Sequence, residues 1–334
     1  IAAITGLPAG IPVISAGGDQ QCAALGMGLV CAGDTIVSTG TGAYVMSLTE
    51  KPLFDPQRRV FCNLSAMPSL HVLEASTPAA GVVFRWFAEG MYRPSGGAEA
   101  VRQSGKATAS GVAVPGDMFA FMNTDIASAA PGAGGLVFLP HFTGAGAPYW
   151  NPEARGVFFG LTLSTSRADM ARAVLEGIAA EMARNVMVLR SFASLDGRVL
   201  ASGGLTRSPL FAKMLASMTG QPVSMASSAE ATAAGAWIGA AVALGLYPGH
   251  AAAHAALTAA AALDGDVGSA GAPRPAAGTP QPSGTGFTPG SGAQTLAACS
   301  DAGTVVMPDP ALVPVYAELM ERRAALYDTL YRAR

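Results

Sequence analysis

Three glycine-containing stretches decide the fold that this sequence predicts: Gly17-Gly18-Asp19-Gln20-Gln21, Ser38-Thr39-Gly40-Thr41-Gly42 and Ser202-Gly203-Gly204-Leu205. Each follows a short apolar run typical of a strand, so each turn is expected at a strand end. Backbone amides freed at such turns suit phosphate oxygens. A carboxylate on a tight strand-to-helix turn suits proton abstraction from a hydroxyl. Together the stretches favour an enzyme that moves the terminal phosphoryl group of a nucleotide onto an alcohol.

The composition indicates a globular protein rather than a nucleic-acid or membrane protein. Half of the 334 residues are apolar and 13% are charged, which predicts a sizeable buried core. The length suits roughly two domains. The net charge of −2, with no basic block, argues against nucleic acid as a partner. The most apolar run, residues 231–247, is mostly Ala and Gly without Lys or Arg flanks, so we expect a buried helix packed through small residues.

Several common site patterns are absent from the sequence. The four cysteines show no CxxC or other metal spacing, and neither HExxH nor GxxxxGK[ST] occurs. With no signal peptide, a cytoplasmic protein with reduced thiols is expected. The chain starts at Ile1, and residues 6–13 look like a strand already entering a fold. We therefore expect a piece of a longer protein whose N-terminal part is absent.

Apolar periodicity predicts alternating strands and helices, and hence a layered α/β domain. Strands are expected at residues 11–16, 34–38, 44–48, 70–76, 135–142, 155–162, 199–202, 223–226 and 304–307. Those at 34–38 and 44–48 flank the Gly-Thr-Gly turn and predict a hairpin. Helices are expected at residues 20–30, 78–92, 166–192, 209–219, 232–246 and 310–332, with Ser166 as the cap of the third. Between the last helices, residues 248–303 are rich in Ala, Gly, Pro, Ser and Thr, which indicates a low-complexity, disordered insertion.

One pattern resembles the C-terminal signature of the FGGY carbohydrate kinases at every constrained position. It runs Gly156-Val157-Phe158-Phe159-Gly160-Leu161 and, seven residues on, Asp169 to Glu176. Kinases of this family phosphorylate glycerol, pentuloses and related polyols with ATP. The resemblance covers residues 1–247 and 304–334 as the C-terminal, nucleotide-side domain. It implies the actin-like, ribonuclease H-like ATPase fold, a mixed sheet flanked by helices, with the N-terminal domain absent from this chain.

On the acceptor side, the resemblance makes Asp19 the catalytic base, with a role in binding magnesium through water. The alternative is a purely structural role, in which Asp19 only caps the following helix, as Asp often does. Gln20 resembles a residue that hydrogen-bonds the acceptor hydroxyls. The alternative is that Gln20 is only an exposed glutamine in the first turn of the helix. Tyr44 aligns with an aromatic that packs on the acceptor's carbon skeleton, and a core tyrosine fits it nearly as well.

On the nucleotide side, the resemblance implies a second phosphate loop, a helix-start glycine with an arginine one turn on, and an adenosine motif followed by a polar residue. The second phosphate loop is Gly40, Thr41 and Gly42. The helix-start glycine is Gly81, and the arginine is Arg85. The adenosine motif is Gly203, Gly204 and Leu205, and the polar residue is Ser208. Each has an ordinary alternative. Glycines are routine in hairpin turns and in strand-to-helix packing, and arginines are usually at the surface. Two signature carboxylates, Asp169 and Glu176, sit at helical spacing and are expected to be structural or solvated.

The implied cofactors are ATP and Mg²⁺, and the implied partner is a small sugar or polyol, with a homodimer as one possible assembly. The Gly-Asp-Gln-Gln sequence and residues 142–150 favour a glycerol-like acceptor. Xylulose, ribulose, fuculose and gluconate are alternative acceptors. A catalytically inactive nucleotide-binding or regulatory module of the same fold is the main alternative. A sugar-binding module without turnover is a weaker one. Without the N-terminal domain, we expect the isolated chain to be inactive.

Overall fold

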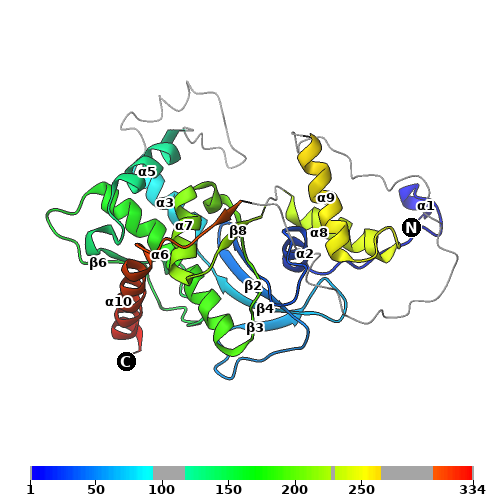
Figure 1. The fold of residues 1–334 in the computed structure, drawn as a ribbon, viewed down its shortest axis with the longest axis horizontal. Coiled ribbons are helices and arrows are strands. Elements are labelled where there is room, and N and C mark those ends of the chain that lie inside the picture. Colours follow the sequence, from blue (N-terminus) through cyan, green and yellow to red (C-terminus); the bar gives the residue numbers. More distant parts are fainter. Residues whose placement is uncertain (1, 93–116, 227–229, 265–303, 333–334) are drawn as a thin grey trace.

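A mixed β-sheet lies at the centre of the structure, a computed structural model that describes residues 2–92, 117–226, 230–264 and 304–332 (Figure 1). Its strands follow the spatial order β3-β4-β2-β1-β7-β8-β9. They are β1 Thr35–Thr39, β2 Ala43–Thr49, β3 Phe61–Leu64, β4 His71–Thr77, β7 Val199–Gly203, β8 Val223–Met225 and β9 Val305–Val306. A second, two-stranded sheet pairs β5 Val137–Leu139 with β6 Val157–Phe159.

Helices cover both faces of the large sheet (Figure 1). On one side lie α2 Asp19–Gly26, α8 Ala231–Ala243 and α9 His250–Asp264. On the other lie α3 Gly81–Met91, α5 Asp117–Ser128, α6 Arg167–Phe192, α7 Pro209–Thr219 and α10 Val313–Tyr331. Shorter pieces are α1 Ala2–Thr5 and the 3₁₀ turns η1 Ala133–Gly135 and η2 Gly204–Arg207. This layering is the α/β arrangement that the strand–helix alternation predicts.

Each central strand feeds two separate cores because successive side chains point to opposite faces of a sheet. On β1, Val37 belongs to the core under α3, α6 and α7, whereas Ile36 belongs to the core under α2, α8 and α9. On β2, Val45 and Met46 divide in the same way. All four side chains are fully buried. The sheet is therefore anchored on both faces, which fixes the register of its strands.

Strand β1 is the centre of this arrangement. It pairs antiparallel with β2 from Thr35↔Ser47 to Thr39↔Ala43, as the hairpin prediction requires. It also pairs parallel with β7, and this ladder ends at Thr39↔Gly203. The carboxyl ends of β1 and β7, each followed by a predicted glycine turn, therefore lie side by side.

The long helix α6 begins and packs as its sequence predicts. Ser166 Oγ accepts from the Asp169 amide at 3.1 Å and the Asp169 carboxylate accepts from the Ser166 amide at 2.9 Å, which is a capping box. Glu176 is 1% exposed and pairs with Arg172 at 2.7 Å. It also accepts from the Gly132 amide at 3.0 Å. Both signature carboxylates are thus structural, as expected.

The Ala-rich helix α8 packs on α2 through backbone contact. A Cβ on Gly235 would collide with the carbonyl oxygen of Cys22, and a Cβ on Gly26 would collide with that of Ala231. Only glycine permits this approach, so the expected packing through small residues is confirmed. The expectation that the helix is buried is wrong, because only Gly235, Ile238 and Ala241 of α8 are buried. No helix among the described residues is long and apolar enough to cross a membrane.

Four sequence expectations need correction. Residues 11–16 form no strand, and Ile11 and Val13 are exposed, because an apolar run without a pairing partner gains nothing from extension. Strand β3 and helix α5 were not anticipated.

The disordered insertion expected at 248–303 does not begin at residue 248. Alanine, the best helix former, builds α9 over residues 250–264. Ala251 and Ala253 of α9 are buried in the core with α2 and α8. The rest of that expected insertion, residues 265–303, lies outside the described residues.

The cysteines differ in state. Cys22 and Cys62 are free thiols, as expected. Cys31 is disulfide-bonded, so the expectation of reduced thiols throughout is wrong at this position.

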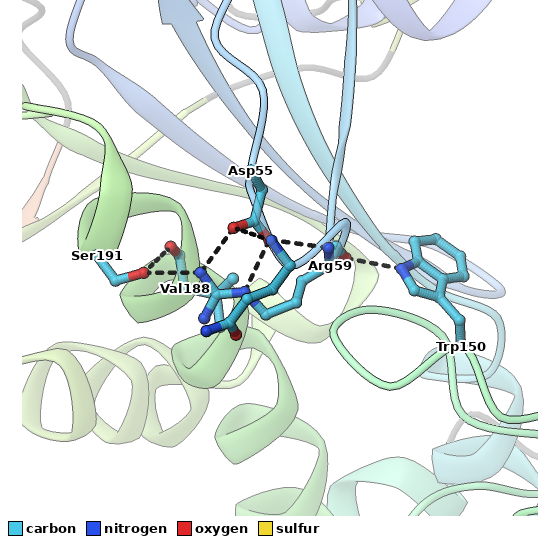
Figure 2. Close-up of polar contacts among 6 residues, drawn as sticks. Asp55, Arg59, Trp150, Val188 and Ser191 are labelled. Atoms are coloured by element: carbon cyan, nitrogen blue, oxygen red, sulfur yellow. Dashed lines mark hydrogen bonds and ion pairs between the residues drawn. The ribbon is translucent and has the colours of Figure 1, made fainter.

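An ion pair between the buried Asp55 and the partly exposed Arg59 lies in the loop after β2, and Arg59 ties this loop to α6 and to the loop after β5 (Figure 2). Asp55 accepts from Arg59 Nε at 2.7 Å and from Arg59 Nη2 at 3.0 Å. Arg59 Nη2 also donates to Ser191 Oγ of α6 at 3.2 Å, and its carbonyl accepts from Trp150 Nε1 at 2.8 Å. The Arg59 guanidinium holds the pKa of the Asp55 carboxyl below its usual range. This contact joins three segments that are distant in sequence.

Replacing Asp55 by asparagine should lower the free energy of unfolding at pH 7 by about 2–3 kcal/mol, because Arg59 loses its charged partner. A depressed folded-state pKa stabilises the fold above the unfolded-state pKa, about 4, and this stabilisation is lost as the pH falls through the folded-state value. Asp55→Asn should therefore remove part of the acid sensitivity below about pH 4. Urea unfolding at pH 7 and pH 3 measures both effects.

The matched control is Asp328→Asn, which removes another carboxylate–arginine pair with i,i+4 spacing, to Arg332, but an exposed one. We expect its effect to stay below about 0.5 kcal/mol. Equal effects of the two substitutions would contradict the structural role of Asp55.

Candidate nucleotide-binding site

The hydroxyl of Thr39 joins the two strand ends that carry the glycine turns. Thr39 is 2% exposed, and its Oγ1 donates to the Ser202 carbonyl at 3.0 Å. The same oxygen accepts from the Leu205 amide at 3.3 Å. Gly203 has φ +102°, and a Cβ there would collide with the backbone of Thr39. The turn after β7 is therefore held directly against the end of β1.

The β1–β2 turn is held against the start of α3. The Ala80 amide donates to the Thr41 carbonyl at 3.0 Å, and the Gly81 amide donates to the Gly40 carbonyl at 3.0 Å. A Cβ on Gly81 would collide with that Gly40 oxygen. Because the first amides of α3 are occupied by the turn, the helix start caps the turn. Gly81 is needed for this close approach.

These three segments meet around a cavity of about 650 Å³. Of the residues predicted to bind nucleotide, seven lie on its wall: Gly40, Thr41, Gly81, Arg85, Gly204, Leu205 and Ser208. The wall also contains residues that the sequence analysis did not single out: Thr39, Val82, Phe84, Phe119, Asn123 and Arg207. Segments separated by more than a hundred residues in the sequence thus form one hollow.

The cavity wall is positively charged. Arg85 and Arg207 are both exposed, and the lining includes no carboxylate. Neither arginine forms an ion pair with any residue that the structure describes. Two guanidinium groups without carboxylate partners suit a polyanion such as a phosphate chain. Arg207 follows Gly203-Gly204-Leu205 in the same turn, so its proximity to that motif could have indicated it.

The two remaining predicted glycines do not line the cavity but support it. A Cβ on Gly42 would lie 2.7 Å from the Thr77 carbonyl oxygen, so this turn packs closely on the end of β4. Gly203 makes the close approach to Thr39 described above. Ser208 immediately precedes α7, yet its hydroxyl makes no capping hydrogen bond. It is 6% exposed, and its Oγ has no partner among the described residues.

The predicted acceptor-side residues lie away from this cavity wall. Asp19 is exposed at the first position of α2, and its Oδ1 accepts from the Gln20 amide at 2.8 Å. Gln20 is half-buried beside it. Tyr44 is half-buried and packs against the core under α2, which is the face of the sheet opposite to α3. The roles of Asp19, Gln20 and Tyr44 therefore stay predictions.

The described residues offer no ready-made metal cage, since they include no group of three or more His, Cys, Asp or Glu side chains that could hold an ion. Asp19 fits a lesser role. Only its Oδ1 has a hydrogen-bond partner within the described part of the chain, which leaves Oδ2 available to a metal-bound water. Mg²⁺ commonly binds through one or two carboxylates, several waters and substrate phosphates.

Comparison with known proteins identifies the family. A sequence model of the C-terminal domain of the FGGY family of carbohydrate kinases matches residues 35–244. A glycerol kinase of Alkalilimnicola ehrlichii is 33% identical over 76% of this chain and 48% of its own length. A gluconokinase of Bacillus subtilis is 30% identical over 74% of this chain and 45% of its own length. The chain belongs to the FGGY family of carbohydrate kinases.

The fold comparison agrees. The crystal structure of a xylulose kinase from Rhodospirillum rubrum superimposes with a TM-score of 0.68 and 25% identity, covering 99% of this chain and 54% of that one. The expected actin-like ATPase fold, a mixed sheet flanked by helices, is thereby confirmed. The chain spans about half the length of the relatives it matches.

Gly81→Ala tests the contact between the β1–β2 turn and α3. The added methyl group has no space beside the Gly40 carbonyl, so the turn must shift. We expect the free energy of unfolding to fall by about 1–3 kcal/mol, as for other overpacked sites, and affinity for ADP to weaken. Thermal unfolding and calorimetric titration with ADP and magnesium measure these changes.

Gly90→Ala in the same helix is the matched control, because a Cβ at Gly90 meets nothing within 4 Å. It should stabilise α3 by about 0.5–1 kcal/mol through helix propensity and leave ADP affinity unchanged. If Gly81→Ala behaved like Gly90→Ala, the close approach would be unimportant.

Proposed function

We propose that this chain is the nucleotide-side half of a kinase that transfers the γ-phosphoryl group of ATP to a hydroxyl of a small polyol or ketose sugar. The observation that carries the proposal is the positively charged cavity where the predicted phosphate and adenosine turns meet. Family membership supplies the reaction class. A domain equivalent to the part of the relatives that this chain does not cover completes the enzyme in this proposal.

The nucleotide is proposed to occupy the cavity. Thr41 contacts the terminal phosphates through its backbone amide and its hydroxyl, as expected for a phosphate loop. The Gly40 amide donates to the Gly42 carbonyl at 2.8 Å, so Gly40 shapes the turn that presents Thr41. Arg85 and Arg207 neutralise phosphate charge. Gly204, with Gly203 and Leu205 beside it, provides the close backbone approach for adenosine. This division of roles is the one that the family resemblance implies, and the presence of Gly40, Thr41, Arg85, Gly204, Leu205 and Arg207 on one cavity wall supports it.

Asp19 is proposed as the general base. It accepts the proton of the acceptor hydroxyl while that oxygen forms a bond to the γ-phosphorus and the bond to the β–γ bridging oxygen breaks, releasing ADP. Its exposure and unengaged Oδ2 leave it accessible to an acceptor. Gln20 hydrogen-bonds other hydroxyls of the acceptor, and Tyr44 packs on its carbon skeleton. Mg²⁺ would neutralise phosphate charge, held by the phosphates and by Asp19 through water.

The acceptor is proposed to be of the glycerol or pentulose class. The relatives described above carry the names glycerol kinase, gluconokinase and xylulose kinase, so the family accommodates acceptors of different length. The Gly-Asp-Gln-Gln stretch at residues 18–21 favours glycerol-like acceptors among them. We place the enzyme in the cytoplasm, where ATP is supplied, and regard a homodimer as compatible with the fold.

Asp19→Asn tests the proposed base in the kinase that joins this chain to its N-terminal half. The amide keeps the shape of the side chain but accepts a proton far less readily. We expect turnover to fall by roughly 10²–10⁴-fold, the usual contribution of a general base, with ADP affinity unchanged. A coupled ADP-release assay over a panel of polyols and ketoses, with calorimetry for binding, measures both quantities.

Asp196→Asn serves as the control, because Asp196 is an exposed carboxylate outside the nucleotide cavity. It should leave turnover and binding unchanged. Full turnover by Asp19→Asn would remove Asp19 as the base, and a wild-type protein that binds no nucleotide would overturn the proposed function itself.

A further inference from the structure

One polar side chain lies in the middle of the apolar face of α6. Asn185 is fully buried, and its neighbours along this face, Met182 and Leu189, belong to the core under α3, α6 and α7. Its Nδ2 donates to Thr77 Oγ1 at 3.2 Å, whereas its Oδ1 has no hydrogen-bond partner among the described residues. An unpaired amide oxygen in a core costs free energy, and native proteins retain few such groups. The stability of the fold therefore does not explain Asn185.

The partner of Asn185 is the last residue of β4. Thr77 pairs with Ala43, the first residue of β2, so it lies beside the end of the β1–β2 turn. The Thr77 carbonyl oxygen also packs against that turn, where a Cβ on Gly42 would lie 2.7 Å from it. A single residue, Thr77, therefore separates the Asn185 amide from the proposed phosphate loop.

The segment that follows Thr77 holds the same turn from its other side. The amides of residues 80–82 donate to the carbonyl oxygens of Gly40 and Thr41 at 3.0–3.1 Å. Only residues 78–79 lie between these amides and Thr77, so a shift of Thr77 would reach both supports of the turn. The position of Thr77 therefore decides the position of the turn.

Helix α6 is a fixed reference for this contact. Its first turn is closed by the Ser166 capping box. Near its other end, Arg190 Nη2 donates to the Gly197 carbonyl at 3.0 Å, just before β7 begins. Asn185 lies between these two anchor points and transfers the position of the helix to the end of β4.

We propose that Asn185 is a positioning residue for phosphoryl transfer, which holds the end of β4, and thereby the Gly40–Gly42 turn, in the geometry that the transferred group requires. The proposal rests on the proposed function, since it assumes that this turn binds the phosphates. Transition-state stabilisation depends steeply on geometry, because the donors must face charge that develops only during the reaction. Asn185 touches neither nucleotide nor acceptor and acts through Thr77.

Asn185→Ala tests this role in the kinase that joins this chain to its N-terminal half. The variant loses the unpaired oxygen together with the hydrogen bond, and alanine favours a helix, so the unfolding temperature should stay near that of wild type. We expect kcat to fall by roughly 10- to 100-fold, as for small misplacements of reacting groups. The Kd for ADP with magnesium should stay nearly unchanged. A coupled ADP-release assay, thermal unfolding and calorimetry measure these quantities.

Thr77 provides the partner variants. Thr77→Val keeps the shape of the side chain but leaves the Asn185 amide unpaired, so it should reduce kcat as Asn185→Ala does and also lower the unfolding temperature. Thr77→Ser retains the hydroxyl and should keep kcat near the wild-type value. The double variant Asn185→Ala/Thr77→Val should lose no more kcat than either single variant, because both remove the same hydrogen bond.

Ser217→Ala is the matched control for the loss of a buried hydrogen bond. Ser217 of α7 is 2% exposed, and its hydroxyl accepts from the amide of the distant Asp309 at 3.0 Å. Neither residue lines the nucleotide cavity. Ser217→Ala should lower the unfolding temperature and leave kcat unchanged.

Each failure has its own signature. Wild-type kcat in Asn185→Ala would overturn the positioning role. So would a Thr77→Ser variant as slow as Thr77→Val, or a double variant in which the two losses multiply, because either result separates the effect from the hydrogen bond. A kcat that follows the unfolding temperature across all variants, Ser217→Ala included, would show a purely structural role. A wild-type enzyme without ATP-dependent turnover would overturn the proposed function, and this role with it.

Discussion

The parallel pairing of β1 with β7 is the constraint on which the site depends. The ladder ends at Thr39 opposite Gly203, and the Thr39 hydroxyl bonds to the backbone on both sides of that glycine. A polar group in this buried position is stable because both of its hydrogen bonds are made. The carbonyl groups of the turn after β1 accept hydrogen bonds from the amides at the start of α3. One strand pair therefore positions two loops and a helix.

The hairpin of β1 and β2 also connects the nucleotide cavity with the residues proposed to bind the acceptor. Alternation along β1 and β2 sends Thr39 toward the cavity side, whereas Tyr44 packs on the opposite face with α2, which begins at Asp19. The Gly40–Gly42 turn joins these strands and is common to both faces. A phosphate chain bound at this turn would be the natural link between the nucleotide cavity and the proposed base, with the acceptor placed between them.

The sequence predicted those elements whose local pattern and tertiary role agree. The β1–β2 hairpin, the 26-residue helix α6 with its Ser166 cap, and the meeting of the Gly40 and Gly204 turns are of this kind. The apolar run at 11–16 failed because a strand exists only through its partner, and α9 was missed because its alanines resemble low-complexity sequence. Phe119 and Asn123 carry no motif. They line a cavity built by distant segments, which periodicity does not reveal.

The most direct test of the whole account is amide hydrogen exchange of the chain with and without ADP and magnesium. If the glycine turns form a nucleotide site, protection should increase at residues 40–42, at 81–85, at 203–208 and along α5. Exchange in α10, on the far side of α6 and α7, should stay unchanged. Protection confined to other parts of the chain, or no change at saturating ADP, would contradict the central claim that these turns form one nucleotide-binding cavity.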